Sequence, residues 1–363
     1  MTSPRLTVDL AALAQNYRSL RQRQGHTVPA DQTAAVVKAN AYGLGVATVS
    51  ECLWQEGCRR FFVATADEGL ELRQALPEAA IYILAGATPE TMDALHQGSL
   101  IPVLNTPQQC LLWSSNTQSA AALHIDTGMN RLGLPWDTDF TQLPALTLDL
   151  VMTHFARADE ASHPMREHQQ QQFAHSVAGL TQCGWSNFWI SANNSAGALT
   201  DKTLQATDPA WLDRLGVALY GVNPHEELDS VPAGHPMATV ATLEAQVLQI
   251  RAVQPGAFVG YASTYEVQQP GRLATIGAGY ADGVPRLLSN QGHVYFRGER
   301  LPMVGRISMD SLVVALPESC DLVEGDWVEI FGPNLSLGEV AAQAQTISYE
   351  ILTGLSARVQ RRI

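Results

Sequence analysis

The chain has 363 residues, more than one hydrophobic core usually supports, so two domains are expected. Its 46% apolar and 16% charged residues are typical of a globular protein and exclude an intrinsically disordered chain. The net charge of -13, from 22 basic and 35 acidic residues, disfavours nucleic acid as a partner, because phosphate binding requires clustered lysine and arginine.

The cysteines and the amino terminus indicate where the protein works. The five cysteines are odd in number and lack the spacing of a metal site: Cys52, Cys58, Cys110, Cys183 and Cys320. We therefore expect core thiols in a reducing compartment, and neither disulfides nor a metal ion. The first ten residues lack a basic segment followed by an apolar one, and no run approaches about 18 consecutive apolar residues. The expectation is a soluble, cytoplasmic protein that does not contact a membrane.

Between residues 34 and 221, short apolar runs alternate with stretches of helical period, which is typical of repeated βα units. Eight runs are predicted as strands: 34–40, 60–65, 80–85, 101–105, 121–126, 148–155, 187–192 and 211–220. Helix-compatible segments lie between them, among them 46–56, 89–97 and 167–183. Eight such units predict a (β/α)8 barrel, with an open doubly wound sheet as the alternative. In a barrel, the chemistry lies at the carboxyl ends of the strands, and phosphate groups commonly lie after strands seven and eight.

The pattern changes after about residue 235, where apolar and polar residues begin to alternate, as in 240–247. Such period-two stretches, with Gly and Pro turns at 254–256 and 269–271, predict a mostly β second domain. Only 337–344 and 348–355 have a helical pattern there. The predicted division is a barrel over residues 1–235 and a β-rich domain over residues 236–363.

A lysine lies near the end of the first predicted strand. Residues 35–45 read Ala-Val-Val-Lys-Ala-Asn-Ala-Tyr-Gly-Leu-Gly, so Lys38 lies where an apolar strand turns into glycines. A strand interior seldom accommodates an ammonium, and a desolvated lysine amine is a nucleophile suited to forming a Schiff base. The alternative is a strand-end lysine that reaches water.

Polar motifs follow the later strands of the predicted barrel. After strand five, Asp-Thr-Gly-Met-Asn-Arg-Leu-Gly places Arg131, whose planar guanidinium suits carboxylate oxygens. His154 lies at the end of strand six, and Ser195 follows strand seven, where backbone amides and its hydroxyl can hold a phosphate. After strand eight, Gly216 lets backbone amides approach a phosphate. The alternatives are a surface arginine, a structural histidine and a helix-capping serine.

The run at 35–45 resembles the pyridoxal-phosphate attachment motif of alanine racemases. Further segments resemble the same family: 126–133, 152–156, 194–197, 213–221, 259–265, 276–283, 305–310 and 348–352. The resemblance spans Val8 to Arg361 and implies a pyridoxal-phosphate-dependent racemase that interconverts L-alanine and D-alanine. It would supply D-alanine for peptidoglycan or serve alanine catabolism. The resemblance also implies a homodimer with shared active sites.

The resemblance assigns Lys38 to hold the cofactor as an aldimine. The implied cofactor-binding residues are Lys38, Tyr42, Asn194, Ser195, Arg214, Gly216, Val217 and Tyr349. Arg214 would face the pyridine nitrogen, and because an arginine is essentially never deprotonated, it cannot leave a proton on that nitrogen. The carbanion would then be held briefly instead of being delocalised into a state that transaminates, which favours racemisation.

By the same resemblance, the second domain supplies a second catalytic base, Tyr261. Lys38 and Tyr261 would exchange the Cα proton from opposite faces of the substrate, so that inversion follows. The implied catalytic residues are Lys38, Tyr261, Arg131, His154 and Arg214. The implied substrate-binding residues are Arg131, Tyr280, Met309 and Asp310.

Three positions depart from the family pattern. His124 stands where many racemases carry a lysine that becomes carbamylated, so a bound anion or the neutral imidazole is expected to fill that place. Leu215 replaces a proline and Ser308 replaces a cysteine.

Three other functions are alternatives to an alanine racemase. The first is a broad-specificity or serine racemase of the same fold. The others are a decarboxylase, for which an acidic residue is expected in place of Arg214, and a non-catalytic pyridoxal-phosphate carrier.

Overall fold

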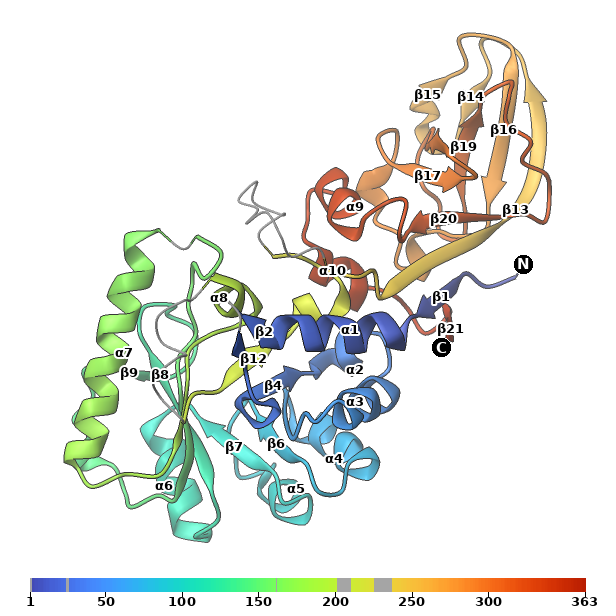
Figure 1. Cartoon of the computed structure of the whole chain (residues 1–363). Coiled ribbons are helices and arrows are strands. Elements are labelled where there is room, and N and C mark those ends of the chain that lie inside the picture. Colours follow the sequence, from blue (N-terminus) through green and yellow to red (C-terminus); the bar gives the residue numbers. More distant parts are fainter. Residues whose placement is uncertain (1, 24–25, 161, 201–209, 225–236) are drawn as a thin grey trace.

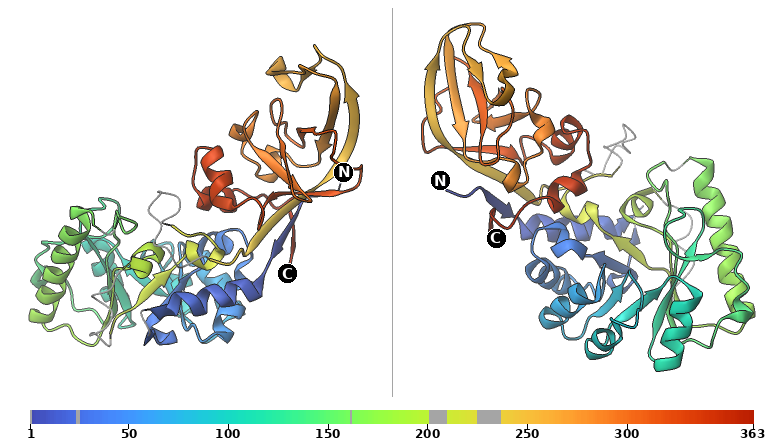
Figure 2. Two further views of the ribbon diagram at one scale, coloured as in Figure 1. Left: turned by 45° about the horizontal axis from the view of Figure 1, so that its top comes forward. Right: turned by 180° about the vertical axis from the view of Figure 1, so that it is seen from behind.

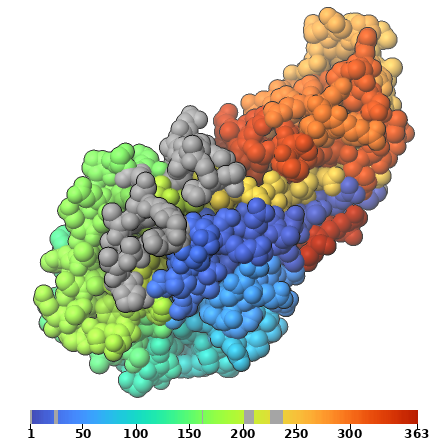
Figure 3. All heavy atoms as spheres, in the orientation of Figure 1, coloured from blue at the N-terminus to red at the C-terminus, as the bar shows by residue number. Residues whose placement is uncertain are grey.

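The computed structural model describes residues 2–23, 26–160, 162–200, 210–224 and 237–363. These residues form two bodies, a barrel of strands and helices and a mostly β domain that projects from it (Figure 1). Both further views show the same elongated arrangement (Figure 2). On the face drawn in Figure 3, the orange and red residues of the carboxyl domain project from the body of the barrel.

Eight parallel strands form the barrel: β4 (Thr33–Val36), β5 (Arg60–Val63), β6 (Ala80–Ile83), β7 (Ile101–Leu104), β8 (Ala121–Asp126), β10 (Leu148–Met152), β11 (Trp189–Ser191) and β12 (Asp213–Leu215). The sheet runs β11-β10-β8-β7-β6-β5-β4-β12, with the short strand β9 (Leu134–Pro135) paired to β8. A parallel bridge between Ile190 and Trp211 joins β11 to the segment that leads into β12. The sheet is therefore nearly closed, which confirms the predicted (β/α)8 barrel against the open sheet.

Helices surround these strands (Figure 1): α1 (Leu10–Arg21), α3 (Val46–Gln55), α4 (Ala66–Ala75), α5 (Met92–Gln97), α6 (Pro107–Asn116), α7 (Pro164–Gln182) and the short α8 (Ser195–Thr200). Local capping explains where helix α6 begins. Thr106 caps α6, with Pro107 at the first helical position, where its missing N–H costs no hydrogen bond. Most of the predicted strands extend beyond the strands found, and the excess is largest for the first and the last, because the short helix α2 (Lys38–Tyr42) follows β4 and the 3-10 turn η3 (Val217–Tyr220) follows β12.

The interior of the barrel is packed with side chains from alternate strand positions. A buried cluster fills it: Ala34, Phe62, Tyr82, Val103, Ala122, Leu150, Met152 and Leu212. The rings of Phe62 and Tyr82 stack with their centroids 4.4 Å apart. Below them, at the amino ends of the strands, Arg60 donates to the Tyr82 hydroxyl and forms an ion pair of 3.3 Å with Asp149. These side chains close the amino end of the barrel. A ligand is therefore expected to enter at the opposite end, where the strands have their carboxyl ends.

The carboxyl domain is mostly β, as predicted. Its long strand β13 (Ala241–Val253) pairs antiparallel with β16 (Gly271–Ile276) and β20 (Trp327–Phe331). The remaining strands are β14 (Phe258–Val259), β15 (Tyr265–Glu266), β17 (His293–Phe296), β18 (Glu299–Pro302) and β19 (Leu312–Leu316). The two predicted helical segments form α9 (Leu337–Gln343) and α10 (Ser348–Thr353).

The two ends of the chain lie together in the sheet of the carboxyl domain. Strand β1 (Arg5–Val8) pairs antiparallel with β13 and parallel with β21 (Gln360–Arg362). Residues 5–8, which the predicted division assigned to the barrel range, therefore belong to the second sheet. The predicted boundary at 235 lies outside the described residues and stays a prediction. Within the described ranges, no helix is long and apolar enough to cross a membrane.

Candidate active site

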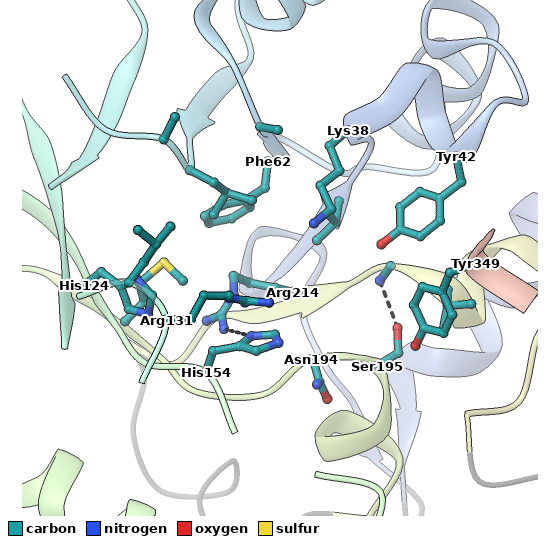
Figure 4. A pocket seen from close by; sticks show the side chains of 18 of the residues that line it. Lys38, Tyr42, Phe62, His124, Arg131, His154, Asn194, Ser195, Arg214 and Tyr349 are labelled. Atoms are coloured by element: carbon teal, nitrogen blue, oxygen red, sulfur yellow. Dashed lines mark hydrogen bonds between the residues drawn. The ribbon is translucent and has the colours of Figure 1, made fainter. Parts of the chain in front are cut away.

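A cavity of about 640 Å³ opens at the carboxyl ends of the barrel strands, a volume suited to a small-molecule ligand. It brings together the residues that the sequence predicted in the barrel: Lys38, Tyr42, Arg131, His154, Asn194, Ser195, Arg214, Gly216 and Val217, with His124 and, from α10, Tyr349. In Figure 4 the Lys38 side chain points into this space, with the two arginines across from it and Tyr42 and Tyr349 at one end.

Lys38 lies two residues beyond the end of β4 and begins α2. The next four residues, 39–42, have φ values between 51° and 56°, so the chain makes a left-handed turn directly after the lysine. Burial lowers the pKa of the Lys38 amine, and the positive charge of Arg131 lowers it further, while Glu68 raises it. A lowered pKa leaves more of the amine unprotonated and nucleophilic at neutral pH.

Arg214 points from β12 into the cavity and is buried. Its Nη2 donates to the Thr153 carbonyl at 2.7 Å and lies 3.4 Å from His154 Nδ1, and its Nη1 donates to the Ser191 hydroxyl. Burial lowers the pKa of Arg214 to about 10, so the guanidinium stays charged at neutral pH. Because arginine can only donate, His154 Nδ1 is the acceptor of this contact.

Two neutral histidines lie beside these cations. Burial, with the positive charges of Arg214 and Arg131, holds the pKa of His154 well below its usual range. Burial and Arg214 lower the pKa of His124 to about 4. His124 Nδ1 lies 2.9 Å from the Asn105 Oδ1, and the Asn105 amide nitrogen donates to two backbone carbonyls. Asn105 Oδ1 is therefore an acceptor, and the proton of His124 lies on Nδ1.

The loops after β11 and β12 form a cradle. The backbone N–H of Gly216 donates to the Ser195 hydroxyl at 2.9 Å (Figure 4), and that of Ala218 does so at 3.4 Å. A Cβ at Gly216 would lie 2.8 Å from the Tyr42 hydroxyl, so only glycine leaves this space open. Burial raises the pKa of Tyr42 to about 12, which keeps its hydroxyl protonated as a donor. These backbone and hydroxyl groups suit a phosphate.

The loop that carries Arg131 is held by Asp126 at the end of β8. The Asp126 Oδ1 accepts from the backbone N–H groups of residues 128, 129 and 130, at 2.9, 2.9 and 3.1 Å. Glycines with positive φ at 128 and 133 allow the sharp turn. Arg131 thus reaches the cavity from a fixed loop. An Asp followed two residues later by Gly is the sequence signal for such a turn.

Four predicted site residues do not line this cavity: Tyr261, Tyr280, Met309 and Asp310. We call them the carboxyl-domain patch. Tyr261 and Met309 are exposed by 72% and 52%. Backbone hydrogen bonds join the segment of Tyr280 to that of Met309, since the Ala281 N–H donates to the Met309 carbonyl at 3.0 Å. Tyr261 lies between β14 and β15, at the end of the carboxyl domain far from the barrel (Figures 1 and 2). One copy of the chain does not bring Tyr261 to Lys38.

Some lining residues were not singled out from the sequence, among them Phe62, Thr65, Leu84 and Thr353. Phe62 and Leu84 lie in or just after apolar strands, and nothing in such a run marks a site. Glu68 was also missed, although it contacts the turn after Lys38. Its signal was the pair Thr65-x-x-Glu68, which is a helix-capping pattern.

The residues that line the cavity fit a ligand that carries both an aldehyde and a phosphate. Lys38 supplies an amine of lowered pKa, and the loops after β11 and β12 supply the Ser195 hydroxyl, which accepts from two backbone N–H groups and has its own proton to donate. Arg131 and Arg214 make the cavity positive although the chain is acidic.

Comparisons with known proteins agree along the chain. The profile described as "Alanine racemase, N-terminal domain" matches residues 8–224, and "Alanine racemase, C-terminal domain" matches residues 240–363. "Alanine racemase, catabolic" of Agrobacterium fabrum is 40% identical to this chain, over 99% of this chain and 92% of that protein. "Alanine racemase" of Acidiphilium cryptum is also 40% identical, over 99% of both chains.

Solved structures are similar over the full length. The alanine racemase from Bartonella henselae, solved with covalently bound pyridoxal phosphate, superposes with a TM-score of 0.88 at 36% identity, over 100% of this chain and 99% of that one. The biosynthetic alanine racemase from Pseudomonas aeruginosa superposes with a TM-score of 0.84 at 33% identity, over the same shares.

Proposed function

This chain belongs to the alanine racemase family, and from that premise we propose that it is a pyridoxal-phosphate-dependent enzyme that interconverts L-alanine and D-alanine. The cavity at the carboxyl ends of the barrel strands carries the proposal. It combines a lysine amine of lowered pKa, a buried arginine and a cradle suited to phosphate.

Pyridoxal phosphate, when bound, withdraws electrons from the Cα of an attached amino acid and so acidifies its Cα–H. Lys38 would hold the cofactor through its amine and, once released, move the Cα proton. Ser195, Gly216, Tyr42 and Tyr349 would hold the phosphate.

Two arginines would have separate roles at the reacting centre. Arg214 would face the ring nitrogen and leave it unprotonated, because its guanidinium stays charged. Its buried contacts to Ser191 and Thr153 hold that guanidinium in one place. Arg131 would bind the substrate carboxylate, since its side chain reaches the cavity from the loop that Asp126 holds. His154, as a neutral acceptor beside Arg214, would orient the latter without adding positive charge.

Racemisation requires a proton donor and acceptor on both faces of Cα, and we infer that Tyr261 of a second copy supplies the other face. In its own chain Tyr261 is exposed and does not line the cavity. The carboxyl-domain patch exposes large apolar side chains, as expected of a surface that another chain covers. We therefore propose a homodimer in which each cavity is completed by the partner's patch, including Tyr280, Met309 and Asp310.

We also infer that the enzyme works in the cytoplasm. All five cysteines, each within the described ranges, are free thiols, which favours a reducing compartment.

The test is chiral amino-acid analysis after incubating the purified protein and pyridoxal phosphate with an equimolar mixture of L-amino acids. D-alanine is expected far ahead of all other D-amino acids, and Lys38→Ala is expected to form none. Several D-amino acids at similar rates would instead assign a broad-specificity racemase. Carbon dioxide release without any D-amino acid would assign a decarboxylase.

A further inference from the structure

The turn after Lys38 adopts a conformation that its residues do not favour. Ala39, Asn40, Ala41 and Tyr42 all have positive φ, although each has a Cβ. A left-handed helical conformation brings the Cβ of such residues too close to the backbone, so a run of four persists only where neighbouring groups hold it. The position of the Lys38 amine depends on these groups, because the turn begins at the next residue.

Besides backbone hydrogen bonds within the segment, three side-chain hydrogen bonds hold the turn. The Glu68 Oε1 accepts from the backbone N–H of Ala39 at 2.7 Å. The Asn40 side chain accepts from the Val46 N–H at 2.7 Å, and Arg361 donates to the Gly43 carbonyl at 2.8 Å. Of the three, the Glu68 contact lies nearest to Lys38 along the chain.

The same carboxylate is anchored on the barrel. Its Oε2 accepts from the N–H groups of Ala64 at 2.7 Å and Thr65 at 3.2 Å, which lie between β5 and α4. The Thr65 hydroxyl in turn accepts from the Glu68 N–H at 3.3 Å, which completes a capping box at the start of α4. One side chain therefore ties a rigid part of the barrel to the turn that follows Lys38.

Glu68 also acts on the charge of the amine. Burial and Arg131, which follows β8, lower the pKa of Lys38, whereas Glu68 on α4 raises it. The amine in turn lowers the pKa of His154, which follows β10. Replacing the Glu68 carboxylate by a neutral group therefore lowers the pKa of Lys38 and leaves more free amine at a given pH.

We propose that Glu68 is a positioning residue for Lys38, whose carboxylate holds the left-handed turn and so aims the amine into the cavity. The inference rests on the proposed function, because it takes Lys38 as the residue that holds the cofactor. The competing reading is that Glu68 only caps α4. The two readings differ in what happens when the cap is kept and the bond to Ala39 is lost.

Glu68→Gln separates these readings. Three N–H donors converge on the two carboxylate oxygens, and glutamine has one oxygen and an NH2 group that cannot accept. Turning the oxygen toward Ala64 and Thr65 keeps two hydrogen bonds, so the NH2 group faces the Ala39 N–H and the turn loses its contact. Asp67→Asn is the matched control, because Asp67 is an exposed carboxylate in the same first turn of α4.

The holoenzymes of both variants and the wild type are compared in two measurements. The first is the loss of cofactor absorbance on dialysis, which we expect to be at least about tenfold faster in Glu68→Gln. The second is kcat for L-alanine against pH, where we expect a fall of about tenfold or more, since small misplacements of a reacting group are costly. In Glu68→Gln the acid limb of this profile is expected to move to lower pH. Without the Glu68 carboxylate the pKa of the Lys38 amine is lower, so the amine loses its proton at lower pH. Asp67→Asn is expected to match the wild type.

Two further variants separate position from charge. Glu68→Asp keeps the charge but shortens the reach, so we expect fast cofactor loss with an unmoved acid limb. Adding Ala39→Gly to Glu68→Gln should restore part of the cofactor retention, since glycine adopts positive φ readily. Both variants still test the proposal if Glu68→Gln alone does not fold.

A Glu68→Gln protein that keeps its cofactor, its kcat and its acid limb, whatever its thermal stability, would overturn the proposal in favour of capping. If the wild type forms no D-alanine, the proposed function fails, yet the comparison of cofactor loss still decides the role of Glu68.

Discussion

At the scale of single residues, the cavity concentrates positive charge in a chain whose net charge is -13. Lys38, Arg131 and Arg214 all line it, and among the residues that the structure describes no carboxylate does. Burial keeps His124 and His154 neutral beside these cations. The two imidazoles therefore supply hydrogen bonds without further repulsion, and the cavity attracts anionic groups of a ligand.

The neutral His124 makes stability depend on pH. Its pKa is about 4 in the folded chain and about 6.5 in an unfolded one, so the unfolded state binds the proton more readily. The stability that this group contributes is present above about pH 6.5 and is lost as the pH falls through about 4, by roughly 3 kcal/mol in all. We expect the thermal midpoint of His124→Gln to fall less between pH 7 and pH 4 than that of the wild type. His96→Gln, at an exposed histidine, should follow the wild type, and equal slopes in all three would contradict the assignment.

Gly216 is predicted to be intolerant of any side chain. In Gly216→Ala the new Cβ would lie 2.8 Å from the Tyr42 hydroxyl, and Tyr42 is itself buried, so ring and cradle must move apart. We expect affinity for pyridoxal phosphate to fall at least tenfold, about 1.4 kcal/mol, in a titration of the apoprotein. Gly271→Ala is the control, since a Cβ there meets only the Gln269 carbonyl at 3.9 Å. Unchanged affinity in Gly216→Ala would show that the cradle is not where the phosphate binds.

At the scale of secondary-structure elements, helix α7 holds two loops of the site at once. Gln169 is fully buried and accepts from the Ala156 N–H at 2.9 Å. Its amide donates to the Thr127 hydroxyl at 3.1 Å and to the His154 carbonyl at 3.2 Å. Thr127 belongs to the loop that carries Arg131, so one glutamine sets the positions of both motifs.

Gln169→Leu is expected to destabilise the chain and to impair catalysis. It leaves the Thr127 hydroxyl, the His154 carbonyl and the Ala156 N–H without this partner inside the fold, and each such loss costs about 1–3 kcal/mol where the group is shielded from water. We expect the free energy of unfolding to drop by roughly 3 kcal/mol or more, and kcat/KM for alanine to fall with it. Denaturant titration and steady-state rates measure the two effects. Gln171→Leu on the exposed face of α7 should change stability by no more than about 0.5 kcal/mol.

At the scale of the whole molecule, the barrel and the carboxyl domain are joined at both ends of the chain. Strands β1 and β21 lie in the carboxyl sheet, and Arg361 of β21 donates to the Gly43 carbonyl beside the turn after Lys38. The carboxyl domain thus supports the cavity of its own chain, while its patch with Tyr261 faces outward.

Mixed dimers test whether the patch serves the partner's cavity. Lys38→Ala and Tyr261→Phe are each expected to be inactive, because each lacks one proton-transfer group in both sites. After dissociation and reassociation of an equal mixture, half of the dimers are mixed and each has one complete site, so we expect about a quarter of wild-type activity. A mixture of Lys38→Ala with Arg131→Ala should recover none, since both changes lie in the barrel. No recovery in the first mixture would contradict shared sites.

The sequence by itself determined the class of fold and predicted the candidate reactive groups. Short apolar runs and the helical segments between them are local patterns, and eight such repeats predicted the barrel, while period-two alternation after about residue 235 predicted the β-rich domain. Lys38, Ser195 and Gly216 were found because each lies in a short motif at the end of a strand. Strand lengths were overestimated at Lys38 and Val217, because side-chain pattern does not report where the backbone turns left-handed or begins a 3-10 turn.

Only the tertiary structure decided which groups meet. Gln169 lies in a run of glutamines and Glu68 in an ordinary capping pattern, yet both hold site loops that are 13 to 42 residues away in the chain. The neutrality of His124 and His154 depends on burial among arginines from other strands. The strand β1 joins the carboxyl sheet although it begins the chain. These features arise from closure of the barrel and docking of the two bodies, which bring together residues that no local pattern relates.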